Sequence, residues 1–105
     1  MNINKSEFQL EIINRLKELR LNQKISQAAI SDILGLNSYG SIGNIESSKF
    51  KHKYTLKHIS ILCNEFQYPI EKLFLNDSEL LLDKKEYTEC LIKKIIEYGG
   101  QGIDY

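Results

Sequence analysis

Apolar side chains recur at the spacing of an α-helix along most of this chain, and that periodicity limits the folds open to it. The first such face consists of Phe8, Ile12, Leu16 and Leu19. Ser6 and Gln9 lie just before and within this segment at the spacing of a capping box, which marks a helix N-terminus. We therefore predict a first helix over residues 7–22.

Two short helices are predicted next. Ser26 is a favourable N-cap and Gly35 a natural C-terminal stop, so the first of them spans residues 27–34. The second lies within Ser38–Ser47. Its inward-facing residues are Ile42 and Ile45. A glycine-containing turn thus separates two short helices, which is the pattern of a helix-turn-helix unit.

Two further helices complete a five-helix unit. Thr55 caps the fourth, with Tyr54 and Ile59 placed as a hydrophobic staple. Its apolar face comprises Leu56, Ile59, Leu62, Cys63 and Phe66. Pro69 suits the first turn of a brief fifth helix, in which Leu73 packs inward. Strand signals are poor throughout, and Leu80–Leu82 is the one weak candidate.

A last helix is predicted over residues 84–98, opened by Asp83 and closed by Gly99 and Gly100. Its apolar side carries Tyr87, Cys90, Leu91, Ile92, Ile95, Ile96 and Tyr98. Because this face is broad for a terminal helix, it must pack on the five-helix core or on a second subunit. The fold class is therefore all-α, with a domain over residues 1–76 and a C-terminal extension over 77–105 as a dimerisation element.

The sequence favours a cytoplasmic protein without a membrane span. No segment approaches the ~20 apolar residues that a span requires, and no apolar run follows Lys5 as in a secretory signal. Cys63 and Cys90 lie outside any CxxC spacing and within apolar helical patterns. We interpret both as reduced core residues, with a disulfide between them as the less favoured alternative.

Charge is unevenly distributed on a chain whose formal net charge is zero. Residues 1–74 contain ten Lys or Arg against seven Asp or Glu, whereas residues 75–105 contain four against seven. Residues 47–64 include four lysines, two histidines and no acid. Such a local basic segment is typical of a confined phosphate contact, although a solvated surface loop would look similar.

Several anchors at the right separations give the chain a family resemblance. They are the Leu-Lys-Glu-Leu-Arg run of the first helix, Ser26-Gln27, Gly35 with an apolar residue after it, and Ile45-Glu46. The segments IINRLKELRLNQKISQAAISDILGL, SIGNIESSKF and TLKHISILCNEFQYPIEKLF, within residues 12–74, resemble the Cro and phage-repressor (XRE) helix-turn-helix family. The resemblance implies a lambda-repressor-like five-helix domain whose recognition helix enters the major groove.

The resemblance also implies roles for individual residues. Gln27 would contact backbone phosphate and support the recognition helix. Arg20 and Glu46 would form an ion pair between the first and third helices, the alternative being two surface charges that never meet. The residues expected to reach base edges are Ser38, Tyr39, Ser41 and Asn44. Those expected at the DNA backbone are Gln27, Lys49, Lys51, His52, Lys53 and Tyr54.

The recognition segment departs from the family pattern. It is about one residue longer than usual and contains Gly40 and Gly43, each of which costs roughly 1 kcal/mol inside a helix. We therefore expect this helix to start late or to settle fully on DNA. Gly43 suits close helix packing, whereas Gly40 has no such explanation. Phe50 is expected to plug the core rather than contact DNA.

The function predicted from the sequence is a sequence-specific regulator of transcription, with repression as the favoured mode, that binds double-stranded DNA as a homodimer at an inverted repeat. The stronger rival is a protein-interaction module that keeps the fold, with a protein partner at the C-terminal helix. An enzyme is disfavoured, because His52, His58, Cys63 and Cys90 have no catalytic or zinc-binding spacing. No cofactor and no metal are expected.

Overall fold

The computed structural model describes residues 5–38 and 40–99. Within these ranges the chain forms six α-helices and one 3-10 helix and contains no strand, so the expectation of an all-α chain is confirmed. The helices are α1 (Glu7–Asn22), α2 (Gln27–Leu34), α3 (Ser41–Glu46), α4 (Leu56–Phe66), α5 (Ile70–Phe74), η1 (Glu79–Leu81) and α6 (Lys84–Gly99).

The helix ends follow the capping signals. Ser6 and Gln9 form the capping box of α1. Ser26 accepts from the Ala29 N–H at the start of α2, at 3.0 Å. Gly35 closes α2 in the left-handed region, at φ 70°. The weak strand candidate at Leu80–Leu82 is wrong: the Asn76 side chain accepts from the Glu79 N–H at 2.8 Å and winds this segment into η1.

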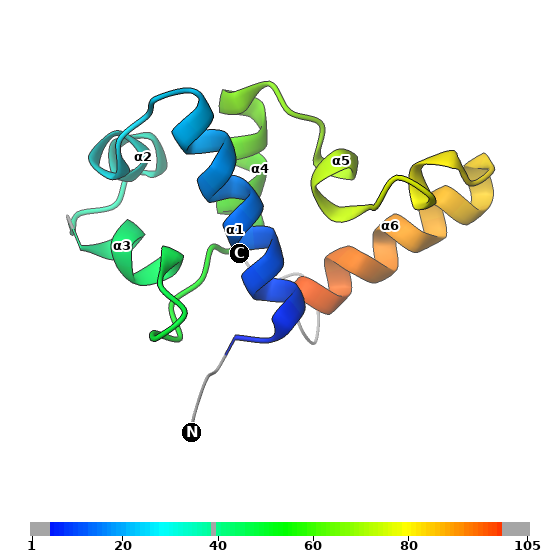
Figure 1. Ribbon diagram of the computed structural model, residues 1–105, viewed down its shortest axis with the longest axis horizontal. Coiled ribbons are helices and arrows are strands. Elements are labelled where there is room, and N and C mark those ends of the chain that lie inside the picture. Colours follow the sequence, from blue (N-terminus) through cyan, green and yellow to red (C-terminus); the bar gives the residue numbers. More distant parts are fainter. Residues whose placement is uncertain (1–4, 39, 100–105) are drawn as a thin grey trace.

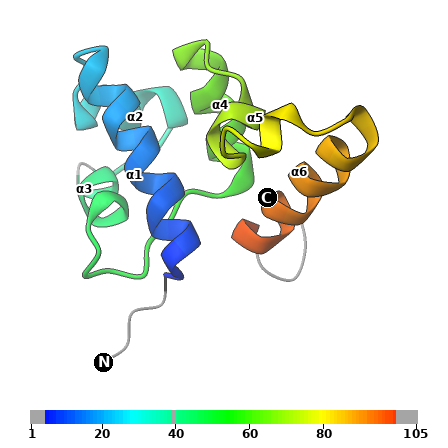
Figure 2. The ribbon, with the colours of Figure 1, turned by 45° about the vertical axis from the view of Figure 1, so that its right-hand side comes forward.

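Helix α1 is central to the molecule. It packs against α3, α4, α5 and α6. Helices α2 and α3 lie on one side of α1, whereas α5 and α6 lie on the other (Figures 1 and 2). The buried cluster between them contains apolar residues from α1 to α6, with Ile12, Ile42, Ile59 and Leu73 completely buried. Burial of this apolar surface is the main stabilising contribution to such a domain.

The last turn of α6 belongs to that same core. Tyr98 is only 1% exposed and meets the ring of Phe74 edge-on, with 6.0 Å between ring centroids. Its hydroxyl donates to the Tyr54 carbonyl at 2.8 Å, and its own carbonyl accepts from Gln9 Nε2 at 2.7 Å. The core therefore extends across the predicted boundary between residues 76 and 77.

The rest of α6 is divided between two environments. Leu91 and Ile95 pack against the core cluster. Ile92 and Ile96 are 51% and 45% exposed, and Leu81 of η1 is 86% exposed. The broad apolar face thus covers the core with one part and leaves another part open. None of the described helices is long and apolar enough to cross a membrane.

The two cysteines differ in environment. Cys63 is buried in α4 and burial raises the pKa of its thiol to about 11. Cys90 is only half-buried, because it faces η1 rather than the core, and its Sγ lies 3.3 Å from a carboxylate oxygen of Glu79. Both thiols are free, so the interpretation of reduced cysteines agrees with the structure, whereas a core position for Cys90 is wrong.

Candidate nucleic-acid interface

Helices α2 and α3 approach each other closely at their facing ends. A Cβ atom placed on Gly43 would lie 3.6 Å from Gln27 Oε1, an ordinary contact distance, so the start of α2 would also fit against α3 with an alanine there. The close packing expected to require Gly43 is therefore not found. Gly40 is the N-cap residue of α3, outside the helix proper, so α3 starts late and Gly40 carries no helix-interior cost.

A buried serine fixes the connection between these two helices. Ser31 of α2 is 3% exposed, and its hydroxyl lies 3.4 Å from the carbonyl oxygens of both Leu36 and Ser38. The hydroxyl thereby satisfies polar backbone in a turn that has no regular partners. Sequence reasoning missed this residue, since a serine on a helix is ordinarily assigned to the surface.

The predicted ion pair between Arg20 and Glu46 is present and closes α3 onto the rest of the fold. Its two hydrogen bonds measure 2.8 and 2.9 Å, and the side chains are 9% and 4% exposed. Gln27 Nε2 donates to the same carboxylate at 3.0 Å. Because the pair is buried and bidentate, removing one partner would cost about 3–5 kcal/mol by leaving the other charge unpaired.

The residues predicted to read base edges lie on and before α3. Ser38 is exposed, and Ser41 and Asn44 are half-buried. The Asn44 side chain forms no hydrogen bond with the described residues. Tyr39 lies outside the described residues.

The predicted backbone contacts form an open basic loop after α3. Lys49, Lys51, His52 and Lys53 are all exposed, as is Gln27 at the start of α2. Within the described part of the chain, none of these lysines has an acidic partner within ion-pair distance. The loop begins on the same side of α1 as α2 and α3 (Figures 1 and 2). Uncompensated cations beside a short helix with half-buried polar side chains can contact phosphate groups.

Two expectations about this segment are wrong, and they are wrong in opposite directions. Tyr54 is 2% exposed, because it precedes the N-cap of α4 and enters the core as part of the hydrophobic staple. Burial, together with the Glu46 carboxylate, raises the pKa of its hydroxyl, and it cannot contact DNA. Phe50 is 47% exposed rather than a core plug; it lies edge-on to His52 at the loop surface.

Lys5 is the other residue that sequence reasoning missed. Although charged, it is 4% exposed, and its Nζ lies 2.6, 2.7 and 3.4 Å from the carbonyl oxygens of Ile45, Ser47 and Asn44. These carbonyls end α3. No sequence signal indicates such a contact, because the acceptors are backbone carbonyl groups about forty positions away.

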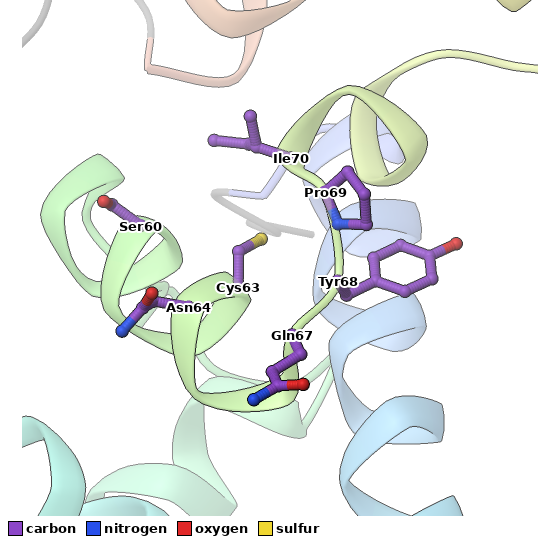
Figure 3. A pocket seen from close by; sticks show the side chains of 7 residues that line it. All are labelled: Ser60, Cys63, Asn64, Gln67, Tyr68, Pro69 and Ile70. Atoms are coloured by element: carbon purple, nitrogen blue, oxygen red, sulfur yellow. The ribbon is translucent and has the colours of Figure 1, made fainter.

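A depression away from this interface lies between α4 and α5. It is lined by Ser60, Cys63, Asn64, Gln67, Tyr68, Pro69 and Ile70. Figure 3 shows it as an open hollow from which the Tyr68 ring points away. Among the described residues, no three metal-ligating side chains come together. Comparisons of the chain with family models, with curated proteins and with solved structures found no match.

Proposed function

We propose that the protein is a sequence-specific regulator that binds double-stranded DNA through a helix-turn-helix unit formed by α2 and α3. The observation that carries the proposal is the buried Arg20–Glu46 pair with Gln27 beside it. It holds a six-residue helix with polar outward side chains next to an uncompensated basic loop. A purely structural bundle has no need to fix so short a helix at the surface by a buried ion pair.

In this proposal the parts have separate tasks. Helix α3 enters the major groove, where the Asn44 amide can pair with adenine and the hydroxyls of Ser38 and Ser41 serve several bases. Lys49, Lys51 and Lys53 neutralise phosphates and so confer steep salt dependence. Occupation of a promoter by the domain would repress transcription, which needs no additional surface.

We further propose that α6 pairs with α6 of a second copy. Its exposed residues Ile92 and Ile96 supply apolar contact area. Along the same exposed region Lys85, Glu89, Lys93 and Glu97 alternate in sign at intervals of four, the spacing of one helical stripe. In an antiparallel pair this stripe is complementary to itself: Lys85 of one copy faces Glu97 of the other, and Glu89 faces Lys93.

The second candidate function is that of a protein-interaction module. It is favoured by the 86% exposure of Leu81 and by the open face of α6, which a different protein could cover as well as a second copy. The two candidates differ in what they require of the basic loop, because an interaction module bound at α6 has no use for Lys51 or Lys53.

The decisive test is selection of bound fragments from random duplex DNA, followed by sequencing. The wild-type protein should enrich an inverted repeat, and Lys51→Glu/Lys53→Glu should abolish the enrichment. Lys72→Glu/Lys84→Glu is the matched control, since it changes net charge equally at exposed positions outside both the basic loop and the proposed α6 stripe. Equal loss in both variants, or no enrichment by the wild type at low and moderate salt, favours the interaction module.

The pairing of α6 is tested by sedimentation equilibrium. Glu89→Lys should shift the protein from dimer to monomer, because the substituted side chain would face Lys93 of the second copy and lie beside Lys85 and Lys93 of its own helix. The double variant Glu89→Lys/Lys93→Glu should restore the dimer. A wild-type monomer, or a Glu89→Lys dimer of undiminished affinity, contradicts the proposed pairing. Loss of the pairing would change the expected site from an inverted repeat to a single half-site, whereas the proposed contact of α3 and the basic loop with DNA does not depend on α6.

A further inference from the structure

The ammonium group of Lys5 occupies a position that the proposed DNA contacts do not explain. It is almost completely buried, so it cannot reach phosphate, and it has no carboxylate within ion-pair distance among the described residues. Instead Nζ lies against three carbonyl oxygens at the end of α3, those of Asn44, Ile45 and Ser47. An ammonium group has three N–H donors and no acceptor, so the three carbonyls use its whole capacity.

The last turn of α3 is held by these contacts together with the Arg20–Glu46 pair and the buried side chain of Ile45. Helix α3 consists of six residues, begins at a glycine without a side-chain cap and contains a second glycine. Helices this short are unstable on their own, and their final carbonyls lack intrahelical partners. A cation at that end also interacts favourably with the negative pole of the helix dipole.

The same contacts extend to the start of the basic loop. Lys5 donates to the Ser47 carbonyl, and the Ser47 hydroxyl accepts from the Lys49 N–H at 3.1 Å. One side chain therefore fixes both the end of α3 and the first turn after it. Burial, reinforced by the nearby Lys53, lowers the pKa of Lys5, so the ammonium is held here by its carbonyl acceptors despite an unfavourable environment.

We infer that Lys5 is a positioning residue for base recognition, one that ties the end of α3 and the start of the basic loop to the segment preceding α1. The inference rests on the proposed DNA binding. Glu46 fixes α3 from the side of α1 and α2, and Lys5 fixes it from its C-terminal end. Loss of Lys5 releases the last turn of α3, where Asn44 lies, while the exposed lysines stay available to phosphate.

The test compares Lys5→Met, Lys5→Arg and, as a control for the lost charge, Lys72→Met at an exposed position of α5. Hydrogen exchange of two backbone N–H groups is measured without DNA: that of Asn44, which donates to the Gly40 carbonyl, and that of Ser47, which donates to the Asn44 carbonyl. Affinity is then measured for the selected duplex and for a scrambled duplex. Lys5→Met should accelerate exchange in α3 and lower the ratio of the two affinities roughly tenfold, with scrambled-duplex affinity nearly unchanged.

Lys5→Arg, which keeps a charged donor, should restore slow exchange and specificity at least in part, and Lys72→Met should resemble the wild type. Equal loss of affinity for both duplexes would reduce Lys5 to an electrostatic or general folding role and overturn the inference. Unchanged exchange and an unchanged ratio would overturn it as well. If the wild type prefers no sequence, the proposed function fails, and the exchange data alone still decide whether Lys5 holds α3.

Discussion

A histidine completes the capping box of α4, at a position where glutamate or glutamine is usual. The Thr55 hydroxyl accepts from the His58 N–H at 3.0 Å, and Nδ1 of His58 accepts from the Thr55 N–H at 3.3 Å. Only an unprotonated Nδ1 can accept this bond. Burial and the neighbouring Lys57 lower the pKa of His58 below its ordinary 6.5, which keeps the ring neutral.

This arrangement predicts a pH-dependent stability. Because the pKa is lower in the folded chain, the unfolded chain takes up the proton first as pH falls. The contribution of His58 is therefore intact above pH 6.5 and decreases as pH falls through and below that value. His58→Gln keeps the capping box without titrating, so urea midpoints measured over this range should fall less steeply in the variant. Parallel pH profiles of the wild type and the variant would contradict the prediction. The exposed His52 is present in both proteins, so it does not contribute to a difference between them.

At this scale, apolar and capping residues could be predicted and polar partners mostly could not. Ser6, Ser26 and Thr55 cap their helices because a cap and its acceptor are neighbours in sequence. Lys5 and Gln9 bond to carbonyls of distant elements, and any residue offers a carbonyl, so no residue type marks the partner. Among the described residues every buried side-chain nitrogen and oxygen has a hydrogen-bond partner. Tyr54 has the burial expected of the staple residue before a cap, and this burial removes it from the DNA contacts that the resemblance implied.

At the scale of the element, α3 combines weak intrinsic helicity with strong external restraint. Its two glycines differ in cost, since Gly40 precedes the helix and Gly43 lies within it. A Cβ at Gly43 would meet Gln27 Oε1 at 3.6 Å, an ordinary contact distance. The glycine thus allows more space than an alanine needs.

Gly43→Ala should therefore stabilise the protein. Alanine removes the glycine penalty, and the free energy of unfolding should rise by about 0.5–1 kcal/mol in denaturant titration. Gly35→Ala provides the contrast, because its φ of 70° strains any residue with a Cβ, and it should lower stability by about 1–2 kcal/mol. A lower free energy of unfolding for Gly43→Ala than for the wild type would mean that the contact between α2 and α3 cannot admit a Cβ atom at this point.

Element boundaries were largely predictable because caps and glycines mark them. Helices α1 and α2 begin and end at the residues expected, and α6 ends one residue later than expected. The third helix was placed too broadly, since hydrophobic spacing at Ile42 and Ile45 fits any helix around them. Its late start depends on the Ser31 contacts and on Gly40 as N-cap, neither of which spacing reveals.

At the scale of the whole molecule, α6 contributes to the same buried core as α3. Tyr98 packs with Phe74 and bonds to Tyr54, whereas Ile92 and Ile96 remain open. The sequence left two partners open for this helix, the core and a second subunit. The structure assigns one part of its apolar face to the core, and a single face this broad cannot be fully covered by so small a domain.

Removing residues 77–105 should consequently destabilise residues 1–76 rather than yield an intact domain. Tyr98→Ala alone should lower the free energy of unfolding by about 3–5 kcal/mol, the usual cost of truncating a buried aromatic ring. Thermal unfolding followed by circular dichroism measures both variants, with Glu86→Ala as a control at an exposed position of the same helix outside the proposed pairing surface. A fragment that unfolds at the wild-type temperature would show that the domain boundary predicted from sequence is the better one.

The bond from Gln9 to the carbonyl of Tyr98 joins residues 89 positions apart, near opposite ends of the described chain. Synthesis proceeds from the N-terminus at about 5–20 residues per second, so α1 is complete seconds before the residue that closes the core beside it exists. During that interval the face of α1 that later meets α6 is exposed to water and to chaperones. A nascent chain of this protein is thus expected to gain its stable fold in one late step, as the end of α6 leaves the ribosome.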